Sequence, residues 1–146
     1  MTAVPRHKRG ILDTSTVILL PRIESPKLLP EEPLITSITL AELTVGPLVA
    51  ASDEERAARQ ALLQQAEADF DPLPFDAPAA RAFGQVAASL RQSGRKASAR
   101  SYDAMIAAIA IAHGLPVYTS NPADFAGILG LEVVAVPVPG HSSRLP

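Results

Sequence analysis

The sequence of 146 residues contains no cysteine, which excludes disulfide bonds and metal sites built on thiolates. It has no apolar run long enough to span a bilayer, and its N-terminus lacks the apolar core of a signal peptide. Its net charge at pH 7 is only -2, so the molecule as a whole does not attract a polyanion. These absences predict a cytoplasmic protein without a membrane segment, in which any contact with nucleic acid comes from local basic patches.

The composition is that of a globular protein, with 47% hydrophobic and 19% charged residues, and the length suits one domain with its own core. We expect that domain to cover residues 10–136. A basic extension over residues 1–9 precedes it. Residues 137–146 contain Pro, Gly and Ser without periodicity, which predicts a flexible C-terminal tail.

Short apolar strands alternate with helical patterns along the chain. Strands are predicted over residues 10–13, 34–38, 115–119 and 131–136, with an edge-like strand over 72–75. Helices are predicted over residues 14–20, 39–49, 53–69, 76–94 and 102–113, with a short one after Asn121. This alternation predicts an α/β fold with a mostly parallel central sheet of about four or five strands, flanked by helices.

Four acidic residues, Asp13, Glu42, Asp103 and Asp124, lie where a predicted strand ends or a predicted helix begins. In a parallel α/β sheet such junctions meet at the carboxyl edge. Carboxylates that meet there repel one another unless a cation lies between them, and a hard divalent ion is the simplest candidate. The pattern therefore predicts metal-assisted hydrolysis, most plausibly of a phosphodiester.

Each acid also has a structural explanation. Asp13 is placed to cap the helix that follows it, and Asp103 lies in the first turn of its helix, where the macrodipole favours a carboxylate. The segments 39–42 and 121–124 have the spacing of a capping box. Ser, Thr and Asn residues already stand beside these helix starts, so the acids exceed what capping requires.

Taken together, the acids and their neighbours resemble the motifs of PIN-domain proteins, in particular the VapC-type ribonuclease toxins of bacterial toxin–antitoxin pairs. The resemblance runs from about residue 10 to residue 136. Four segments carry it: Asp13-Thr14-Ser15, Ala41-Glu42-Leu43, Tyr102-Asp103-Ala104-Met105-Ile106-Ala107-Ala108 and Thr119-Ser120-Asn121-Pro122-Ala123-Asp124-Phe125.

The resemblance implies a PIN-like fold, a Mg²⁺ or Mn²⁺ site, endonucleolytic cleavage of RNA, a homodimer and a cognate VapB-like antitoxin that blocks the site. By it, Asp13, Glu42 and Asp103 fall on the three core acidic positions. The fourth position departs from the pattern, because many relatives have Asp where this chain has Asn121. Asp124, three residues later, is then the candidate for the missing charge.

Roles follow as a hypothesis. Asp13 and Asp103 would hold the metal directly or through water, and Glu42 would complete its shell or orient the attacking water. The hydroxyl groups of Ser15 and Thr119 are candidates to position water or phosphate, although local turn bonding is the plainer explanation for Thr119.

Two basic patches are candidates for contact with RNA. One covers residues 6–9, and the other contains Arg91, Arg95, Lys96 and Arg100. Solvated loop charge explains either patch equally well. Arg95, Lys96 and Arg100 are the stronger candidates because they lead directly to Asp103, at a helix N-terminus that suits phosphate.

Three other functions fit the sequence less well. A phosphoacceptor domain lacks its Asp-x-Asp at the first strand, and a nucleotide-binding domain lacks a Gly-rich loop after a strand. A non-catalytic PIN-like binding module remains open, because the apolar stretches 17–20 and 43–49 are able to contact a partner helix. Metal-dependent cleavage of RNA separates that module from an enzyme.

Overall fold

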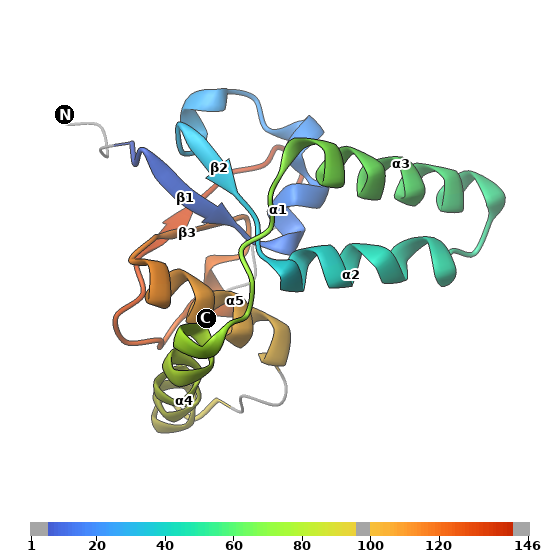
Figure 1. Cartoon of the computed structure of the whole chain (residues 1–146). Helices are drawn as coiled ribbons and strands as arrows, with labels where there is room; N and C mark the ends of the chain where they lie inside the picture. Colours follow the sequence, from blue (N-terminus) through green and yellow to red (C-terminus); the bar gives the residue numbers. More distant parts are fainter. Residues whose placement is uncertain (1–5, 96–99, 142–146) are drawn as a thin grey trace.

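A computed structural model describes residues 6–95 and 100–141, and Figure 1 shows how their elements are arranged. Four parallel strands form one sheet in the order β2-β1-β3-β4. The strands are β1 (Arg9–Leu12), β2 (Glu32–Leu34), β3 (Val117–Thr119) and β4 (Val133–Ala135). The helices are α1 (Thr14–Ile18), α2 (Ser37–Leu48), α3 (Asp53–Asp69), α4 (Ala77–Gln92) and α5 (Ser101–His113). Short 3-10 turns are η1 (Leu20–Arg22), η2 (Pro26–Leu28) and η4 (Pro122–Phe125). The predicted α/β fold with a parallel sheet is confirmed.

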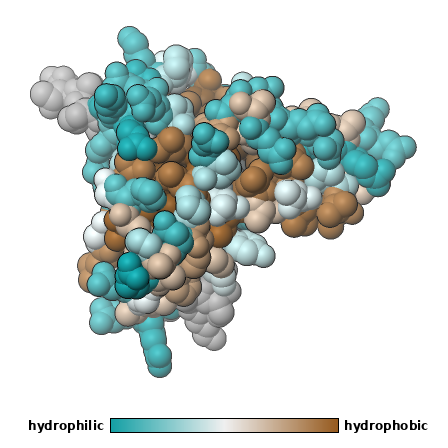
Figure 2. All heavy atoms as spheres, viewed as in Figure 1, coloured by the Kyte–Doolittle hydropathy of each residue, from teal (hydrophilic) through white to brown (hydrophobic). Residues whose placement is uncertain are grey.

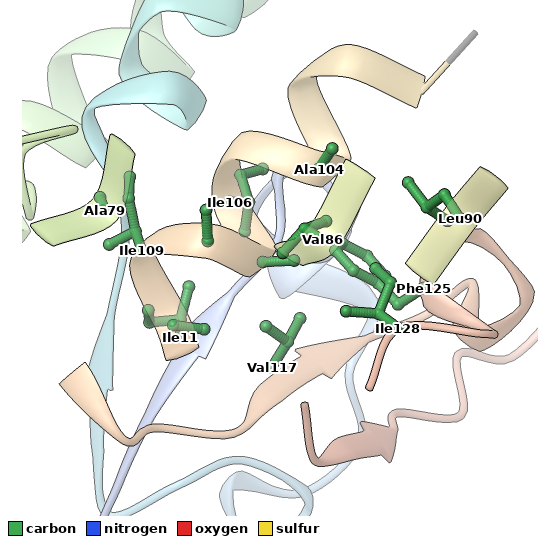
Figure 3. Close-up of a cluster of buried hydrophobic side chains, with 13 residues drawn as sticks. Ile11, Ala79, Val86, Leu90, Ala104, Ile106, Ile109, Val117, Phe125 and Ile128 are labelled. Carbon is green, nitrogen blue, oxygen red and sulfur yellow. The ribbon is translucent and has the colours of Figure 1, made fainter. Parts of the chain in front are cut away.

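The central strands β1 and β3 contribute buried side chains to both faces of the sheet, because successive side chains of a strand point to opposite sides. Ile11 and Val117 point to the face covered by α4 and α5, where they join the cluster drawn in Figure 3. Leu12 and Tyr118 point to the other face, toward Leu43 of α2 and the inner end of α3. None of the helices in the described residues combines the length and hydrophobicity needed to span a bilayer.

Helices α2 and α3 run side by side and form an arm that projects from the body (Figure 1). Ser52 caps α3 by accepting from the backbone N–H of Glu55 at 3.1 Å, and the Glu55 carboxylate accepts from the N–H of Ala51 at 3.0 Å. Figure 2 shows hydrophobic atoms along the lower edge of this arm, where α2 runs. The exposed hydrophobic residues of α2 and its C-terminal end are Val45, Leu48 and Val49.

Several predicted boundaries are wrong, and the reason is local hydrogen bonding. The second strand was expected over residues 34–38, but Thr36 accepts from the N–H of Thr39 and starts α2 at Ser37. The backbone around Leu73 makes only an isolated bridge with Thr36 instead of an edge strand. Ser101 is the first residue of α5 instead of its cap, and the cap position belongs to Arg100, without a side-chain bond.

The chain after β4 packs against the body as far as it is described. Val138 is buried, and its carbonyl accepts from the N–H of His141 at 3.0 Å. Between them, Pro139 and Gly140 form a turn in which Gly140 has φ 75°. The Arg22 guanidinium donates to the carbonyl of Pro139 at 2.6 Å. Residues 137–141 of the predicted tail therefore make specific contacts with the body, and residues 142–146 lie outside the described part.

Candidate active site

The four acids come from four separate elements at the carboxyl edge of the sheet. Asp13 follows β1 directly, and Glu42 lies within α2. Asp103 lies in the first turn of α5, and Asp124 lies in η4, shortly after β3. Electrostatic coupling joins them, since the charges of Asp124, Asp13 and Glu42 all act on Asp103. The edge predicted from the sequence is where these side chains meet.

Asp13 is buried, at 2% exposure, and serves as the N-cap of α1. Its Oδ1 accepts from the backbone N–H of Thr16 at 3.2 Å and from the Thr16 hydroxyl. Its Oδ2 accepts from the hydroxyls of Thr119 at 2.8 Å and Ser15 at 3.1 Å. Burial raises the pKa of Asp13, and these hydrogen bonds oppose the rise. Capping explains Oδ1 alone, so Oδ2 and its two hydroxyl partners require another explanation.

Glu42 lies in the interior of α2, so the capping box predicted for residues 39–42 does not form. The helix begins at Ser37, which places Glu42 beyond the first turn. The Thr14 hydroxyl donates to Glu42 Oε1 at 2.7 Å. Burial, followed by the negative charge of Asp13, raises the pKa of Glu42, while the bond from Thr14 lowers it. The Glu42 carboxylate caps no helix, so capping does not explain why it lies beside Asp13.

The pKa of the Asp103 carboxyl is strongly raised. Burial comes first among the causes that raise its pKa from 3.8 to about 7, followed by the charges of Asp124, Asp13 and Glu42. The guanidinium of Arg100 acts in the opposite direction. A carboxyl that retains its proton near neutrality, in spite of the favourable end of α5, reports burial, to which the negative charges of the neighbouring acids add.

Asp124 is buried and forms an ion pair with Arg100, with 2.5 Å between Nη1 and Oδ1. The capping box predicted for residues 121–124 does not form, because the side chain of Asn121 makes no capping bond to η4. Asn121 instead donates from Nδ2 to Ser15 Oγ at 3.3 Å. Asp124 thus supplies charge to the cluster, and Asn121 joins the hydrogen bonds around Asp13.

This arrangement matches a known domain. The sequence pattern of the PIN domain covers residues 11–128. The chain belongs to the PIN-domain family. Ribonuclease VapC5 of Mycobacterium tuberculosis is 40% identical over 129 residues, which cover 87% of this chain and 93% of that protein. The tRNA(fMet)-specific endonuclease VapC of Shigella flexneri is 34% identical over 98 residues, which cover 67% of this chain and 70% of that protein.

Solved structures agree with this assignment. The crystal structure of VapBC-5, from the VapBC family of toxin–antitoxin systems of Mycobacterium tuberculosis, superposes with a TM-score of 0.77 and 38% identity, covering 88% of this chain and 99% of that one. The DNA-bound VapBC of Salmonella typhimurium gives a TM-score of 0.72 at 29% identity, covering 90% and 99%. The predicted PIN-like fold is confirmed.

The donor set of this PIN domain suits a hard cation. Four carboxylates and the amide oxygen of Asn121 are oxygen ligands of the kind that Mg²⁺ and Mn²⁺ prefer. Within residues 6–95 and 100–141, no three Asp, Glu or His side chains are grouped closely enough to enclose one ion directly. Since Mg²⁺ retains several waters and needs few direct protein ligands, the donor set fits an ion held partly through water.

The basic residues predicted to bind RNA have partners inside this PIN domain. Arg95 Nη1 donates to the carbonyl of Ala123 at 2.6 Å, and Arg100 pairs with Asp124. Lys96 lies outside the described residues. Both guanidinium groups therefore contact the η4 segment, next to the acidic cluster.

Sequence reasoning assigned no role at this site to Thr14 and Thr16, which donate to Glu42 and Asp13, or to His141. His141 Nε2 lies 3.1 Å from Asn121 Oδ1, so the segment after β4 reaches the hydrogen bonds around Asp13. The signal was present in Pro139-Gly140, a dipeptide typical of a tight turn, which predicts that the following residue is directed back toward the body.

Proposed function

We propose that this chain is the toxin of a toxin–antitoxin pair, a metal-dependent endoribonuclease that hydrolyses phosphodiester bonds of RNA. The observation that supports this most strongly is a partly buried group of four carboxylates, in which burial first, and then the charges of the other three acids, raises the pKa of Asp103 to about 7. A pocket that destabilises its own ionised form is useful when a cation enters it. The named relatives are ribonucleases, which supports RNA as the substrate.

In this proposal Asp13 and Asp103 would hold Mg²⁺ or Mn²⁺, and Glu42 and Asp124 would complete the negative shell. Such an ion would supply a water molecule of lowered pKa and a positive charge beside the scissile phosphate. Glu42 orients the attacking water, and the Thr14 hydroxyl holds Glu42 in position at 2.7 Å.

Hydroxyl groups fix the orientation of Asp13. Thr119 and Ser15 both donate to Oδ2, while Thr16 donates to Oδ1. An orienting shell of this kind strengthens a metal ligand and removes its rotational freedom. Asn121 donates to Ser15 and the backbone N–H of Ser120 donates to the Thr16 hydroxyl at 3.0 Å, which completes the shell.

The decisive experiment measures cleavage of RNA by purified protein with Mg²⁺, with Mn²⁺ and with excess EDTA. We expect Asp13→Asn and Asp103→Asn to abolish cleavage and to retain a native circular dichroism spectrum. Asp71→Asn is the matched control, because Asp71 is an exposed carboxylate in the connection between α3 and α4. Cleavage by either site variant at the wild-type rate, or by wild type in EDTA, would contradict the mechanism.

The same experiment addresses the non-catalytic alternative. In a binding module that held no cation, the four acids would destabilise the free protein by their mutual repulsion. No observation in the described residues favours that module. If the wild-type protein binds its partner but leaves RNA intact with either metal, the module replaces the enzyme.

The proposed partner is a VapB-like antitoxin, as in the related VapBC complexes. Two cavities flank Glu42. One, of about 320 Å³, includes Ile18, Leu43 and Leu62, and the other, of about 270 Å³, includes Val45. An antitoxin segment would pack its apolar side chains near residues 17–20 and 43–49. Its Arg or Lys would pair with the carboxylates in place of the cation.

Charge placed in this apolar surface tests the partner. We expect Ile18→Glu and Val45→Glu to weaken antitoxin binding measured by calorimetry and to leave RNA cleavage by the free toxin intact, since both side chains are half exposed. Gln85→Glu, at an exposed position of α4, is the control. A complex in which the antitoxin avoids both regions would refute the proposed surface. We also propose that the toxin is a cytoplasmic homodimer. Its molar mass in solution, measured by light scattering, tests the oligomeric state.

For substrate capture we propose Arg95, Lys96 and Arg100. Arg95 and Arg100 each use one N–H group on the η4 segment, and a guanidinium has five N–H groups, so others are available to phosphate. Each phosphate contact that is lost weakens binding and flattens its salt dependence. We expect Arg95→Ala combined with Lys96→Ala to raise KM for RNA much more than it lowers kcat. An unchanged salt slope would exclude these residues from the RNA interface.

A further inference from the structure

His141 lies at the end of a hydrogen-bonded chain that leads to the buried carboxylate Asp13. Its Nε2 lies 3.1 Å from Asn121 Oδ1, and Asn121 Nδ2 donates to Ser15 Oγ at 3.3 Å. Ser15 Oγ in turn donates to Asp13 Oδ2 at 3.1 Å. His141 falls beyond residues 11–128, the region that matches the PIN domain. The chain therefore links a segment outside the matched region to the centre of the site.

The bond from Ser15 to Asp13 sets the direction of the other protons in this chain. Ser15 donates its single hydroxyl proton to Asp13 Oδ2, so the Ser120 hydroxyl, whose Oγ lies 3.1 Å from Ser15 Oγ, donates to Ser15. Ser15 Oγ then has only lone pairs for Asn121, so the NH₂ group of Asn121 faces Ser15. The amide oxygen is left facing the imidazole, and His141 must carry its proton on Nε2. All three bonds donate toward Asp13 and therefore polarise one another in the same direction.

The backbone around His141 is built to keep the ring there. Pro139 and Gly140 occupy the central positions of a turn closed by the bond from His141 N–H to the Val138 carbonyl at 3.0 Å. A glycine with φ 75° after a proline is the pattern of a type II turn. A Cβ added at Gly140 would lie 3.0 Å from Nη2 of Arg22, the group that donates to the Pro139 carbonyl. The burial of Val138 anchors the other end of the turn.

We propose that His141 is a positioning residue of the ribonuclease site, which orients Asp13 through Asn121 and Ser15. This inference rests on the proposed function for its effect on catalysis, but the hydrogen-bonded chain itself does not depend on it. Asn121 provides an amide where an acid would repel Asp13, and it passes the orientation on because it donates at one end and accepts at the other. The amide at position 121, where many relatives have an acid, thus serves to join His141 to Ser15.

The test combines kinetics with imidazole NMR on the full chain. We expect His141→Ala to lower kcat about tenfold, which is the low end for the loss of an orienting partner, with little change in KM for RNA. His141→Gln should recover most of this loss, because its amide NH₂ reaches a position close to that of Nε2. His113→Ala is the matched control, since His113 is exposed at the far end of α5. Wild-type kcat in His141→Ala, or a Gln variant no better than the Ala variant, would overturn the proposal.

The NMR measurement separates this inference from the proposed function. The Nε2 proton of His141 should be visible and protected from exchange in wild type, and Asn121→Ala should abolish its protection while His113 remains unchanged. A His141 ring without a protected Nε2 proton would overturn the chain of hydrogen bonds, whatever the kinetics. If the NMR signature is present but wild type leaves RNA intact, the proposed function fails and His141 has no catalytic step to support.

Discussion

Replacing Asp103 by asparagine should stabilise the metal-free protein above neutral pH. In the folded protein the pKa of Asp103 is about 7, whereas its ordinary value is 3.8. Between these values the folded state retains a proton that the unfolded state has released. Stability from this group is therefore complete below the ordinary value and falls as the pH rises toward about 7. The amide of the Asp103→Asn variant carries no charge at any pH, so this part of the pH dependence should disappear in the variant.

The magnitude follows from the pH interval. From about pH 5.5 to the pKa near 7 the loss amounts to ~2 kcal/mol, at 1.36 kcal/mol for each pH unit. Asp103 is only partly buried, so solvent screening reduces the effect to ~1 kcal/mol. Urea denaturation in EDTA at about pH 5.5 and about pH 8 measures it. We expect wild type to lose stability between the two conditions, with a smaller loss for Asp103→Asn and an unchanged one for the exposed control Asp71→Asn. A variant that is less stable than wild type at the higher pH would refute the crowding argument.

Three further predictions concern the fold, each measured by urea or thermal denaturation. Ile109→Ala should cost ~2–5 kcal/mol because the side chain is fully buried, whereas Leu48→Ala, at 83% exposure, should change stability by less than ~0.5 kcal/mol. Thr36→Ala should cost ~1 kcal/mol because it removes the cap of α2. Gly10→Ala should lower Tm, because its Cβ would lie 2.8 Å from the ring of the buried Tyr118; an unchanged Tm would contradict the close contact.

The sequence predicted the fold class and the edge where the acids meet, because both depend on features of short range. Apolar strands that alternate with helices require a parallel sheet, and the residue after each strand then lies at its carboxyl edge. Asp13 after β1 and Thr119 at the end of β3 follow from this logic alone. The predicted end of α5 at Gly114 is also confirmed, with φ 66° in the left-handed region.

The sequence did not predict the start of α2 or the contacts of residues 137–141, because several residues of the same kind are able to make these hydrogen bonds. Thr36 and Thr39 are both suitable caps, and only the packed structure shows that Thr36 is used. Val138 is buried and Arg22 binds the turn that follows it, although the residues of this segment lack periodicity. The Pro139-Gly140 dipeptide signals that turn, but nothing in the local sequence says which side chain His141 meets, so its contact with Asn121 was missed.

The strand order has a consequence for the timing of synthesis. β1 lies between β2 and β3, and Asp13 receives a hydrogen bond from Thr119, 106 residues later in the chain. At the usual rate of translation this separation corresponds to ~5–20 s. During that interval the first acid of the site has been made, but the hydroxyl that orients it does not yet exist. An enzyme that cleaves RNA therefore completes its site only after β3 has been made, so its own messenger and ribosome are not exposed to the finished site before then.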